Sequence, residues 1–362
     1  MLKPRNGILD IKPHMMATPV RDGAKATLNL ASNESALGPS PKALVAAVAA
    51  LDSIERYPDE GEARLAEAIG AAFGLKPRRI VCGHGSDELL GRLARAYLDP
   101  GDELIHCVHG YLKFPNYAHA MAAQPVAAPD SDFRASVEGI LSCVTPRTRM
   151  VMLANPDNPT GSYLDGQEIR RLHAGLHDNV LLVLDSAYAE YVAAADYELP
   201  AALIDDAQNV VMTRTFSKIY GLAGMRLGWL YGPPAVVDVM RRLSMTFPVS
   251  APAVAAAIAA VGDREHTDRV FAYNRDLRHW FTQELTDLGL HVYPSQANFV
   301  LIRFDDSTRP AEAAYRYLFE RGIVVRMFNS PDYRNMVRIT LGLEQEMHTA
   351  AAALRDYLRS LP

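Results

Sequence analysis

The sequence predicts an α/β protein with a large domain, built on a mostly parallel sheet flanked by helices, and a smaller α+β domain that follows it. Short apolar runs alternate with helix-like segments between about residues 40 and 240, which is typical of a parallel sheet covered on both faces. After residue 264 the pattern changes to one long helical stretch followed by shorter strands and helices. The chain of 362 residues is also longer than one small core requires.

Each element follows from a local pattern. The first helix of the large domain begins where Ser40, a preferred N-cap residue, precedes Pro41, which suits the first helical position. The next helix ends at Gly74, a common helix-terminating residue. Strands in the large domain are predicted by the apolar runs RRIVC, DELIHCV, TRMVMLAN, NVLLVLD, NVVMTRTF and MRLGWLYG. The small domain is predicted to contain helices near 264–289 and 309–321, a final helix, and the strands HVYP, NFVLIRF, GIVVRMF and MVRITLG.

These patterns divide the chain into three parts. We expect an N-terminal arm at residues 1–40 that packs on the small domain. The large domain is expected at residues 41–263 and the small C-terminal domain at residues 264–362.

Composition and charge make several classes of function improbable. The chain is 49% hydrophobic and 22% charged, and no apolar run is long enough to span a membrane. The net charge of −5 and the lack of a basic run argue against nucleic acid as a partner. Three cysteines without metal or redox spacing, and an N-terminus without a secretory pattern, predict reduced thiols, a cytoplasmic location and no bound metal.

Polar residues of unusual type stand where three of the predicted strands end. One strand ends at Asn155, another at Asp185 with Tyr188 three residues on, and a third is followed by Ser217 and Lys218. Functional residues of such sheets gather beyond the carboxyl ends of the strands. An acid at the end of a buried run needs a partner, and a lysine there can have a depressed pKa and act as a nucleophile.

One cofactor chemistry needs this set of groups together. Pyridoxal phosphate requires a lysine amine for its aldehyde, a carboxylate for its ring nitrogen, donors for its ring oxygen and an anion site for its phosphate. Lys218 and Asp185 suit the first two roles, and Tyr188 and Asn155 suit the third. The anion site is predicted at the glycine turn of GHGSDELL, which opens a helix, and at Thr215, Ser217 and Arg226.

Over nearly its whole length the chain resembles fold-type I pyridoxal-phosphate aminotransferases of the histidinol-phosphate aminotransferase branch. The segments that carry the resemblance are NLASNESALGPSP (29–41), RYP (56–58), GHGSDEL (83–89), ANPDNPTG (154–161), DSAY (185–188), TFSKIYGLAGMRLGW (215–229), QANFVLIRF (296–304) and VRITLG (337–342). They occur in the family's order. The resemblance implies transfer of an amino group between L-glutamate/2-oxoglutarate and histidinol phosphate/imidazole-acetol phosphate, with pyridoxal 5'-phosphate as cofactor, in a homodimer with shared active sites.

The resemblance also implies a role for individual residues. Lys218 would form the Schiff base and move the substrate proton, Asp185 would pair with the ring nitrogen, and Asn155 and Tyr188 would contact the ring oxygen. Tyr111 would stack on the ring. The phosphate would be surrounded by Gly85, Ser86, Ser217, Arg226 and, from the neighbouring subunit, Tyr57. Asp87 and Thr215 are also expected to bind the cofactor. The implied substrate contacts are Asn33, His14, Arg326 and Arg338.

Several alternatives stay open at this level. His14 stands where the family often has a tyrosine, and Leu343 replaces a usual threonine, so an aromatic amino acid is an alternative substrate. A decarboxylase of phosphorylated amino acids and a non-catalytic cofactor-binding domain are further alternatives. A nicotinamide-dependent dehydrogenase is disfavoured, because GHGSDE has Glu88 in place of the third glycine of the dinucleotide fingerprint.

Overall fold

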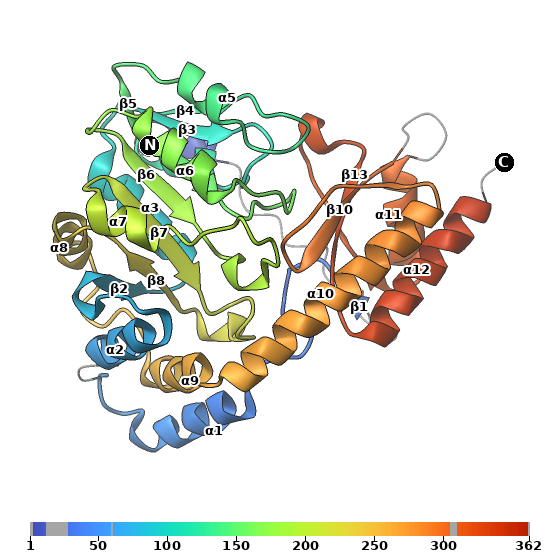
Figure 1. The fold of residues 1–362 in the computed structure, drawn as a ribbon, viewed down its shortest axis with the longest axis horizontal. Helices are drawn as coiled ribbons and strands as arrows, with labels where there is room; N and C mark the ends of the chain where they lie inside the picture. The colour runs from blue at the N-terminus through green and yellow to red at the C-terminus, as the bar shows by residue number, and fades with distance from the viewer. Residues whose placement is uncertain (1–2, 12–27, 59–60, 305–309, 361–362) are drawn as a thin grey trace.

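Seven strands form the central sheet of a large part of the molecule, and a four-stranded sheet forms the core of a smaller part (Figure 1). The computed structural model describes residues 3–11, 28–58, 61–304 and 310–360. In spatial order the large sheet consists of β2 (Ile80–Gly83), β8 (Gly228–Tyr231), β7 (Val210–Thr215), β6 (Leu181–Asp185), β5 (Thr148–Ala154), β3 (Glu103–Cys107) and β4 (Gln124–Ala128). Strand β8 runs antiparallel to both of its neighbours, and the other neighbouring pairs are parallel. The predicted α/β fold with a mostly parallel sheet is confirmed.

Helices cover both faces of this sheet, which explains why its strands are apolar without interruption. Alternate residues of one strand enter different cores: Met150 and Met152 pack on one side of the sheet, and Val151 and Leu153 on the other. The first side is covered by α3 (Ser86–Tyr97), α4 (Phe114–Ala120) and α8 (Pro234–Arg242). The second is covered by α2 (Gly61–Phe73), α5 (Val137–Ser142), α6 (Gly166–Ala174), α7 (Ala201–Asp206) and α9 (Ala251–Gly262). Helix α1 (Pro41–Ala49) packs against α9 and has Ser40 as its N-cap, as predicted.

The edge strand β4 is not among the strands that the sequence predicts. It pairs with β3 alone and contains Pro125. A proline within a strand weakens the sequence signal, yet an edge strand tolerates it because one row of its backbone groups needs no ladder partner.

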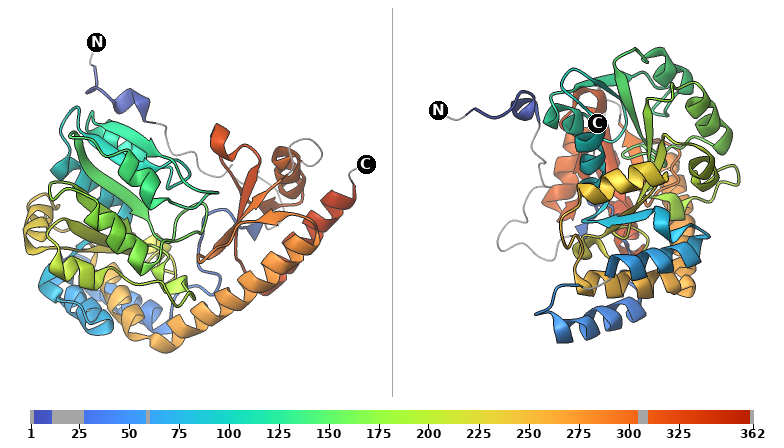
Figure 2. Two further views of the ribbon diagram at one scale, coloured as in Figure 1. Left: turned by 45° about the horizontal axis from the view of Figure 1, so that its top comes forward. Right: turned by 90° about the vertical axis from the view of Figure 1, so that its left-hand side faces the viewer.

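The smaller part is an antiparallel sheet with helices packed on it. Its strands, in spatial order, are β12 (Arg326–Met327), β13 (Met336–Thr340), β10 (Phe299–Arg303) and β9 (His291–Val292). Its helices are α10 (Arg264–Asp287), α11 (Ala311–Glu320) and α12 (Glu344–Arg359). Helix α10 begins beside α9 of the large part and runs along the small sheet, so it joins the two parts (Figures 1 and 2).

The described residues of the N-terminal arm contact both parts. Strand β1 (Leu28–Asn29) pairs in parallel with β11 (Ile323–Val324), and Leu30 enters the core of the small part. The first described residues lie instead at α4, where Arg5 Nη2 donates a hydrogen bond to the carbonyl of Ala120 at 2.7 Å. His14 lies outside the described residues.

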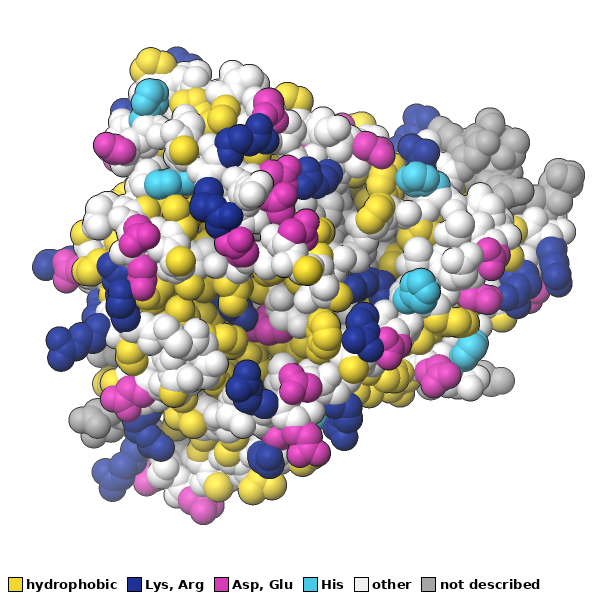
Figure 3. All heavy atoms as spheres, viewed as in Figure 1, with side chains coloured by type: hydrophobic (Ala, Val, Ile, Leu, Met, Phe, Trp, Pro, Cys, Tyr) yellow, Lys and Arg dark blue, Asp and Glu magenta, His cyan; other side chains and the backbone are white. Residues whose placement is uncertain are grey.

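The described residues give two further facts about the molecule as a whole. None of their helices combines the length and the apolar character that a membrane-spanning segment requires. Basic and acidic side chains are interspersed over the face of the molecule that Figure 3 shows.

Candidate active site

A pocket of about 290 Å³ lies beyond the carboxyl ends of β5, β6 and β7, where the polar residues at the strand ends meet. The residues that line it are Ser32, Glu34, Ser86, Asp87, Leu90, Tyr111, Ala154, Pro156, Asn158, Asp185, Ala187, Tyr188, Thr215, Ser217, Lys218, Ala223 and Arg226. The structure therefore brings most of the predicted cofactor residues to one cavity. Parallel strands deliver them there because their carboxyl ends share one edge of the sheet.

Lys218 enters the pocket three residues after the end of β7. Its Nζ donates a hydrogen bond to the carbonyl of Ser32 at 3.3 Å and lies 5.7 Å from the ring centroid of Tyr188. Burial, together with the positive charges of Arg338 and Arg226, lowers the pKa of Lys218 to about 8. The lowered pKa increases the fraction of this amine that is neutral near neutral pH, and the neutral amine is the nucleophilic form.

Asp185 is a buried carboxylate at the end of β6. Thr213 Oγ1 donates a hydrogen bond to its Oδ1 at 3.0 Å, and no salt bridge to it occurs among the residues that the structure describes. Burial raises the pKa of Asp185 to about 7. A cation held against this carboxylate would restore its charged form, and the protonated nitrogen of a pyridine ring is such a cation.

A candidate anion site lies in the same pocket as Lys218 and Asp185, at the start of α3 and beside Arg226. Gly85 and Ser86 begin α3 and pack against Gly228 so closely that a Cβ on Gly228 would lie 2.4 Å from the backbone nitrogen of Ser86. A Cβ on Gly85 would lie 2.9 Å from Nη2 of Arg226, whose Nη1 is 3.5 Å from Ser217 Oγ. Helix N-terminus, hydroxyl and guanidinium together suit a phosphate.

The side chain of Asn155 does not line this pocket. The side chain of Asn155 donates to the carbonyl of Leu164 at 3.0 Å and accepts from the backbone N–H of Leu164 at 2.8 Å, so its amide is used within the large part. Asn158 lines the pocket instead, and its Oδ1 accepts a hydrogen bond from Arg338. Both asparagines lie in the segment ANPDNPTG, and only the path of the turn shows which of the two lines the cavity.

The predicted substrate arginines lie on neighbouring strands of the small sheet. Arg326 on β12 and Arg338 on β13 are register partners. Arg338 is buried, its Nη2 donates to the carbonyl of Ala31 at 2.7 Å, and its Nε has no hydrogen-bond partner in the described structure. Burial lowers the pKa of Arg338 to about 10, which leaves it charged at neutral pH.

Asn33 is buried and orients the hydroxyl of Tyr188. Its Nδ2 donates to the hydroxyl of Tyr188 at 2.9 Å, and its Oδ1 accepts from Thr340 Oγ1 at 2.9 Å. Burial raises the pKa of Tyr188 to about 12, so the phenol keeps its proton. Because Tyr188 accepts from Asn33, its own O–H remains available to donate into the pocket.

Of the other two tyrosines predicted at the cofactor, only one lines the pocket. Tyr111 lines the pocket and meets Phe114 edge-on, with ring centroids 5.3 Å apart. Tyr57 is 76% exposed, stacks on Phe247 with a centroid distance of 4.3 Å, and does not line this pocket.

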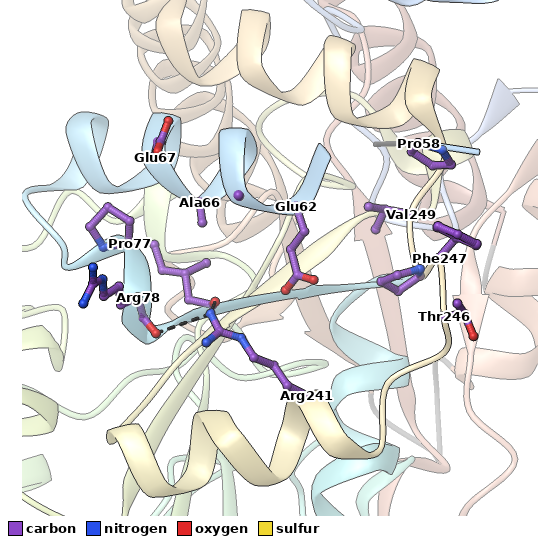
Figure 4. A pocket seen from close by; sticks show the side chains of 13 residues that line it. Pro58, Glu62, Ala66, Glu67, Pro77, Arg78, Arg241, Thr246, Phe247 and Val249 are labelled. Carbon is purple, nitrogen blue, oxygen red and sulfur yellow. Dashed lines mark hydrogen bonds between the residues drawn. The ribbon is translucent and has the colours of Figure 1, made fainter. Parts of the chain in front are cut away.

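A second cavity, of about 530 Å³, lies between α2 and the segment 246–249 (Figure 4). Two of its polar side chains, those of Glu62 and Arg241, form hydrogen bonds to the backbone of β2. Glu62 accepts a hydrogen bond from the backbone N–H of Cys82 at 3.0 Å, and Arg241 donates to the carbonyl of Ile80 at 3.2 Å. These contacts hold an edge of the sheet and assemble no catalytic set.

Comparisons with known proteins agree with this geometry. The family model described as aminotransferase class I and II matches residues 25–354. The histidinol-phosphate aminotransferase of Rhodospirillum centenum is 50% identical over 98% of both chains, and that of Paramagnetospirillum magneticum is 46% identical over the same shares. Among solved structures, the histidinol-phosphate aminotransferase of Sinorhizobium meliloti in complex with pyridoxal-5'-phosphate has a TM-score of 0.87 and 33% identity, covering 93% of this chain and 92% of that one.

Proposed function

The chain belongs to the class I and II aminotransferases, and on that premise we propose that it exchanges an amino group between L-glutamate/2-oxoglutarate and histidinol phosphate/imidazole-acetol phosphate, a reaction of histidine biosynthesis. The resemblance inferred from the sequence motifs is confirmed by the family match. The relatives at 43–50% identity over nearly the whole chain share the name histidinol-phosphate aminotransferase, which favours this substrate over an aromatic amino acid and transamination over decarboxylation.

The protein is a pyridoxal-phosphate-dependent enzyme, and the residues of the pocket fit that group. Asp185, which is buried and forms no salt bridge with any residue that the structure describes, would hold the ring nitrogen, and the O–H of Tyr188 would donate to the ring oxygen. Asn158 takes the role first assigned to Asn155, because its Oδ1 already accepts from Arg338 and its Nδ2 is left to donate. When bound, the cofactor supplies a protonated ring that accepts the electron pair of the broken Cα–H bond.

The phosphate and ring contacts complete this assignment. Tyr111 would stack on the ring. The groups proposed for the phosphate are Gly85, Ser86, Asp87 through its backbone, Thr215, Ser217 and Arg226.

Lys218 is the residue that moves the proton. Its Nζ would take the proton from the substrate Cα and give it back, which requires the neutral amine that the lowered pKa provides. The contact with the carbonyl of Ser32 keeps Nζ at the pocket and leaves its lone pair free, because the amine donates in that hydrogen bond.

The observation that carries the substrate assignment is the arginine pair at the boundary of the two sheets. Arg338 and Arg326 are cross-strand neighbours, and Arg338 already bonds to Asn158 in the pocket. Planar guanidinium groups suit both the carboxylates of glutamate and a phosphate monoester. Asn33 acts through Tyr188, whose hydroxyl it orients.

The homodimer is also part of the proposal. Exposed apolar side chains gather on α1 and near Tyr57: Leu44, Val45, Val48, Leu51, Ile54, Met245 and Phe247. A surface of this kind favours association with a second copy. Tyr57 would reach the phosphate of the neighbouring subunit, which accounts for its distance from the pocket of its own chain. The three free cysteines support a cytoplasmic location.

The visible absorbance spectrum of the purified protein tests the proposed reaction. Adding histidinol phosphate without a keto acid should convert the yellow band of the lysine-bound cofactor to the spectrum of its amine form, and 2-oxoglutarate should restore the yellow band. L-phenylalanine at the same concentration serves as the comparison. A band that persists with histidinol phosphate and disappears with L-phenylalanine would assign the protein to aromatic amino acids instead.

A further inference from the structure

Asp87 places a negative charge in the wall of the pocket where a phosphate is expected. It lies in the first turn of α3, one residue after Ser86, and lines the same cavity as Arg226. Burial is the main cause of the raised pKa values of Asp185 and Tyr111, and the negative charge of Asp87 raises both further. An uncompensated carboxylate here would repel the dianionic phosphate of the cofactor.

Two residues from the neighbouring segment engage this carboxylate. Lys113 Nζ forms an ion pair with Oδ2 of Asp87, and the hydroxyl of Tyr117 donates to Oδ1 at 2.5 Å. The ion pair is about one-third exposed on both sides, with 35% of the Lys113 side chain and 39% of the Asp87 side chain accessible. Lys113 and Tyr117 together bind both oxygens of the Asp87 carboxylate and hold it against α4.

Lys113 also stands two residues after Tyr111, at the N-cap of α4. The ion pair therefore ties the segment that carries the ring-stacking tyrosine to the helix that begins at the candidate anion site. Lys113 shares the segment HGYLKF with Tyr111 but is not one of the residues that the sequence motifs predict at the site.

We propose that Lys113 is a positioning residue for the cofactor phosphate: it neutralises Asp87 and holds the carboxylate against α4, so that the positive end of α3 and Arg226 act on the phosphate unopposed. This inference rests on the proposed placement of the phosphate at Gly85–Ser86. Its consequence is specific, because removing the lysine charge affects ligands in proportion to their own negative charge.

The test is the dissociation constant of two probes, pyridoxal 5'-phosphate and pyridoxal, measured by absorbance titration of the full-length protein freed of cofactor. In Lys113→Met the affinity for pyridoxal 5'-phosphate should fall roughly tenfold, as expected for an exposed carboxylate near a dianion in partly screened surroundings. The affinity for pyridoxal, which has no phosphate, should change less than about twofold on the same argument. Lys113→Arg should retain most of the wild-type affinity, since it keeps the charge.

A double-mutant cycle between Lys113 and Asp87 distinguishes electrostatic positioning of the phosphate from a structural role of Lys113. Adding Asp87→Asn to Lys113→Met should recover most of the lost affinity for pyridoxal 5'-phosphate, because the repulsion is then gone. Lys76→Met is the matched control, since Lys76 also pairs with an aspartate, Asp205, and neither lines the pocket. It should leave both dissociation constants unchanged.

Three outcomes would overturn the inference: unchanged affinity in Lys113→Met, equal losses for the two probes, or a loss that Asp87→Asn does not relieve. Equal losses would mean that Lys113 supports the Tyr111 ring contact instead. Thermal melting of the variants shows whether each is folded. Failure of the wild-type protein to bind pyridoxal 5'-phosphate at all would count against the cofactor assignment, which is a different result from any of these.

Discussion

Arg338 of the small sheet donates a hydrogen bond from Nη1 to Oδ1 of Asn158, 2.5 Å away, in the pocket of the large part. The bond joins residues 180 positions apart and connects the proposed substrate arginine to the proposed ring-oxygen donor. In the proposed assignment, Asn158 is therefore the residue that links the substrate anion site to the cofactor site.

The two asparagines of ANPDNPTG should respond differently to substitution. Asn158→Ala should lower kcat/KM roughly tenfold to a hundredfold, because it removes a donor to the ring and a partner of Arg338. Asn155→Ala should instead destabilise the protein by about 1–3 kcal/mol, since two buried groups of Leu164 lose their partner. Steady-state kinetics and urea unfolding of both variants distinguish these effects. The reverse pattern would restore Asn155 to the cofactor.

Lys218→Ala should lose turnover by a factor of roughly 10⁴ while it still binds pyridoxal phosphate without covalent attachment. The reason is that the other contacts proposed for the ring and phosphate belong to other residues of the pocket, whereas the proposed proton transfer at Cα depends on this amine. Bound cofactor is quantified by absorbance after gel filtration, and turnover by the coupled assay of glutamate formation. Turnover close to that of the wild type would contradict the proposed mechanism.

Arg338→Lys should raise KM for both amino substrates and lower kcat/KM at least about tenfold, because an ammonium cannot reproduce the two-pronged contact of a guanidinium. The substitution also breaks the fork that joins Asn158 and the carbonyl of Ala31. Arg321→Lys is a suitable control, since Arg321 stacks on Tyr317 away from the pocket. An unchanged KM in Arg338→Lys would place the substrate anion elsewhere.

The cofactor-free protein should lose stability as the pH rises from about 4 to about 7. Burial raises the pKa of Asp185 from 3.8 to about 7, so the protonated carboxyl is favoured in the folded state. A raised folded-state pKa gives stability that is complete below the unfolded value and is lost as the pH passes through the folded value. Urea unfolding between pH 4 and pH 7.5 measures this loss. In Asp185→Asn the decline should be shallower; an identical decline in both proteins would mean that other groups cause it.

A mixture of two variants tests whether active sites are shared between subunits. Tyr57→Ala and Lys218→Ala should each have low activity as homodimers. After unfolding and refolding together, mixed dimers contain one site with both Lys218 and the partner's Tyr57, so about a quarter of the wild-type activity should return if assembly is random. Activity no higher than the mean of the two separate variants would indicate that Tyr57 acts within its own chain or not at all.

Much of the fold was predictable because it depends on local patterns. The apolar runs that became β5, β6 and β7 are buried on both faces, and such runs have a strong sequence signal. The positions of Lys218 and Asp185 at the edge of the sheet were predictable for the same reason, because Asp185 ends one of these runs and Lys218 follows another. Strand β4 was not predictable, because an edge strand that contains a proline has only a weak strand pattern in its sequence.

The sequence by itself determined the alternation of strands and helices, the family, and which chemical groups stand at the strand ends. Only the tertiary structure decided which of two nearby asparagines lines the pocket, that Asn33 is hydrogen-bonded to Tyr188, and that Lys113 forms an ion pair with Asp87. The physical reason is the distance along the chain over which each kind of interaction acts. Periodicity and turn residues act over a few positions, whereas the direction of a polar side chain is set by partners such as Leu164 or Arg338 that the chain brings near only when it is folded.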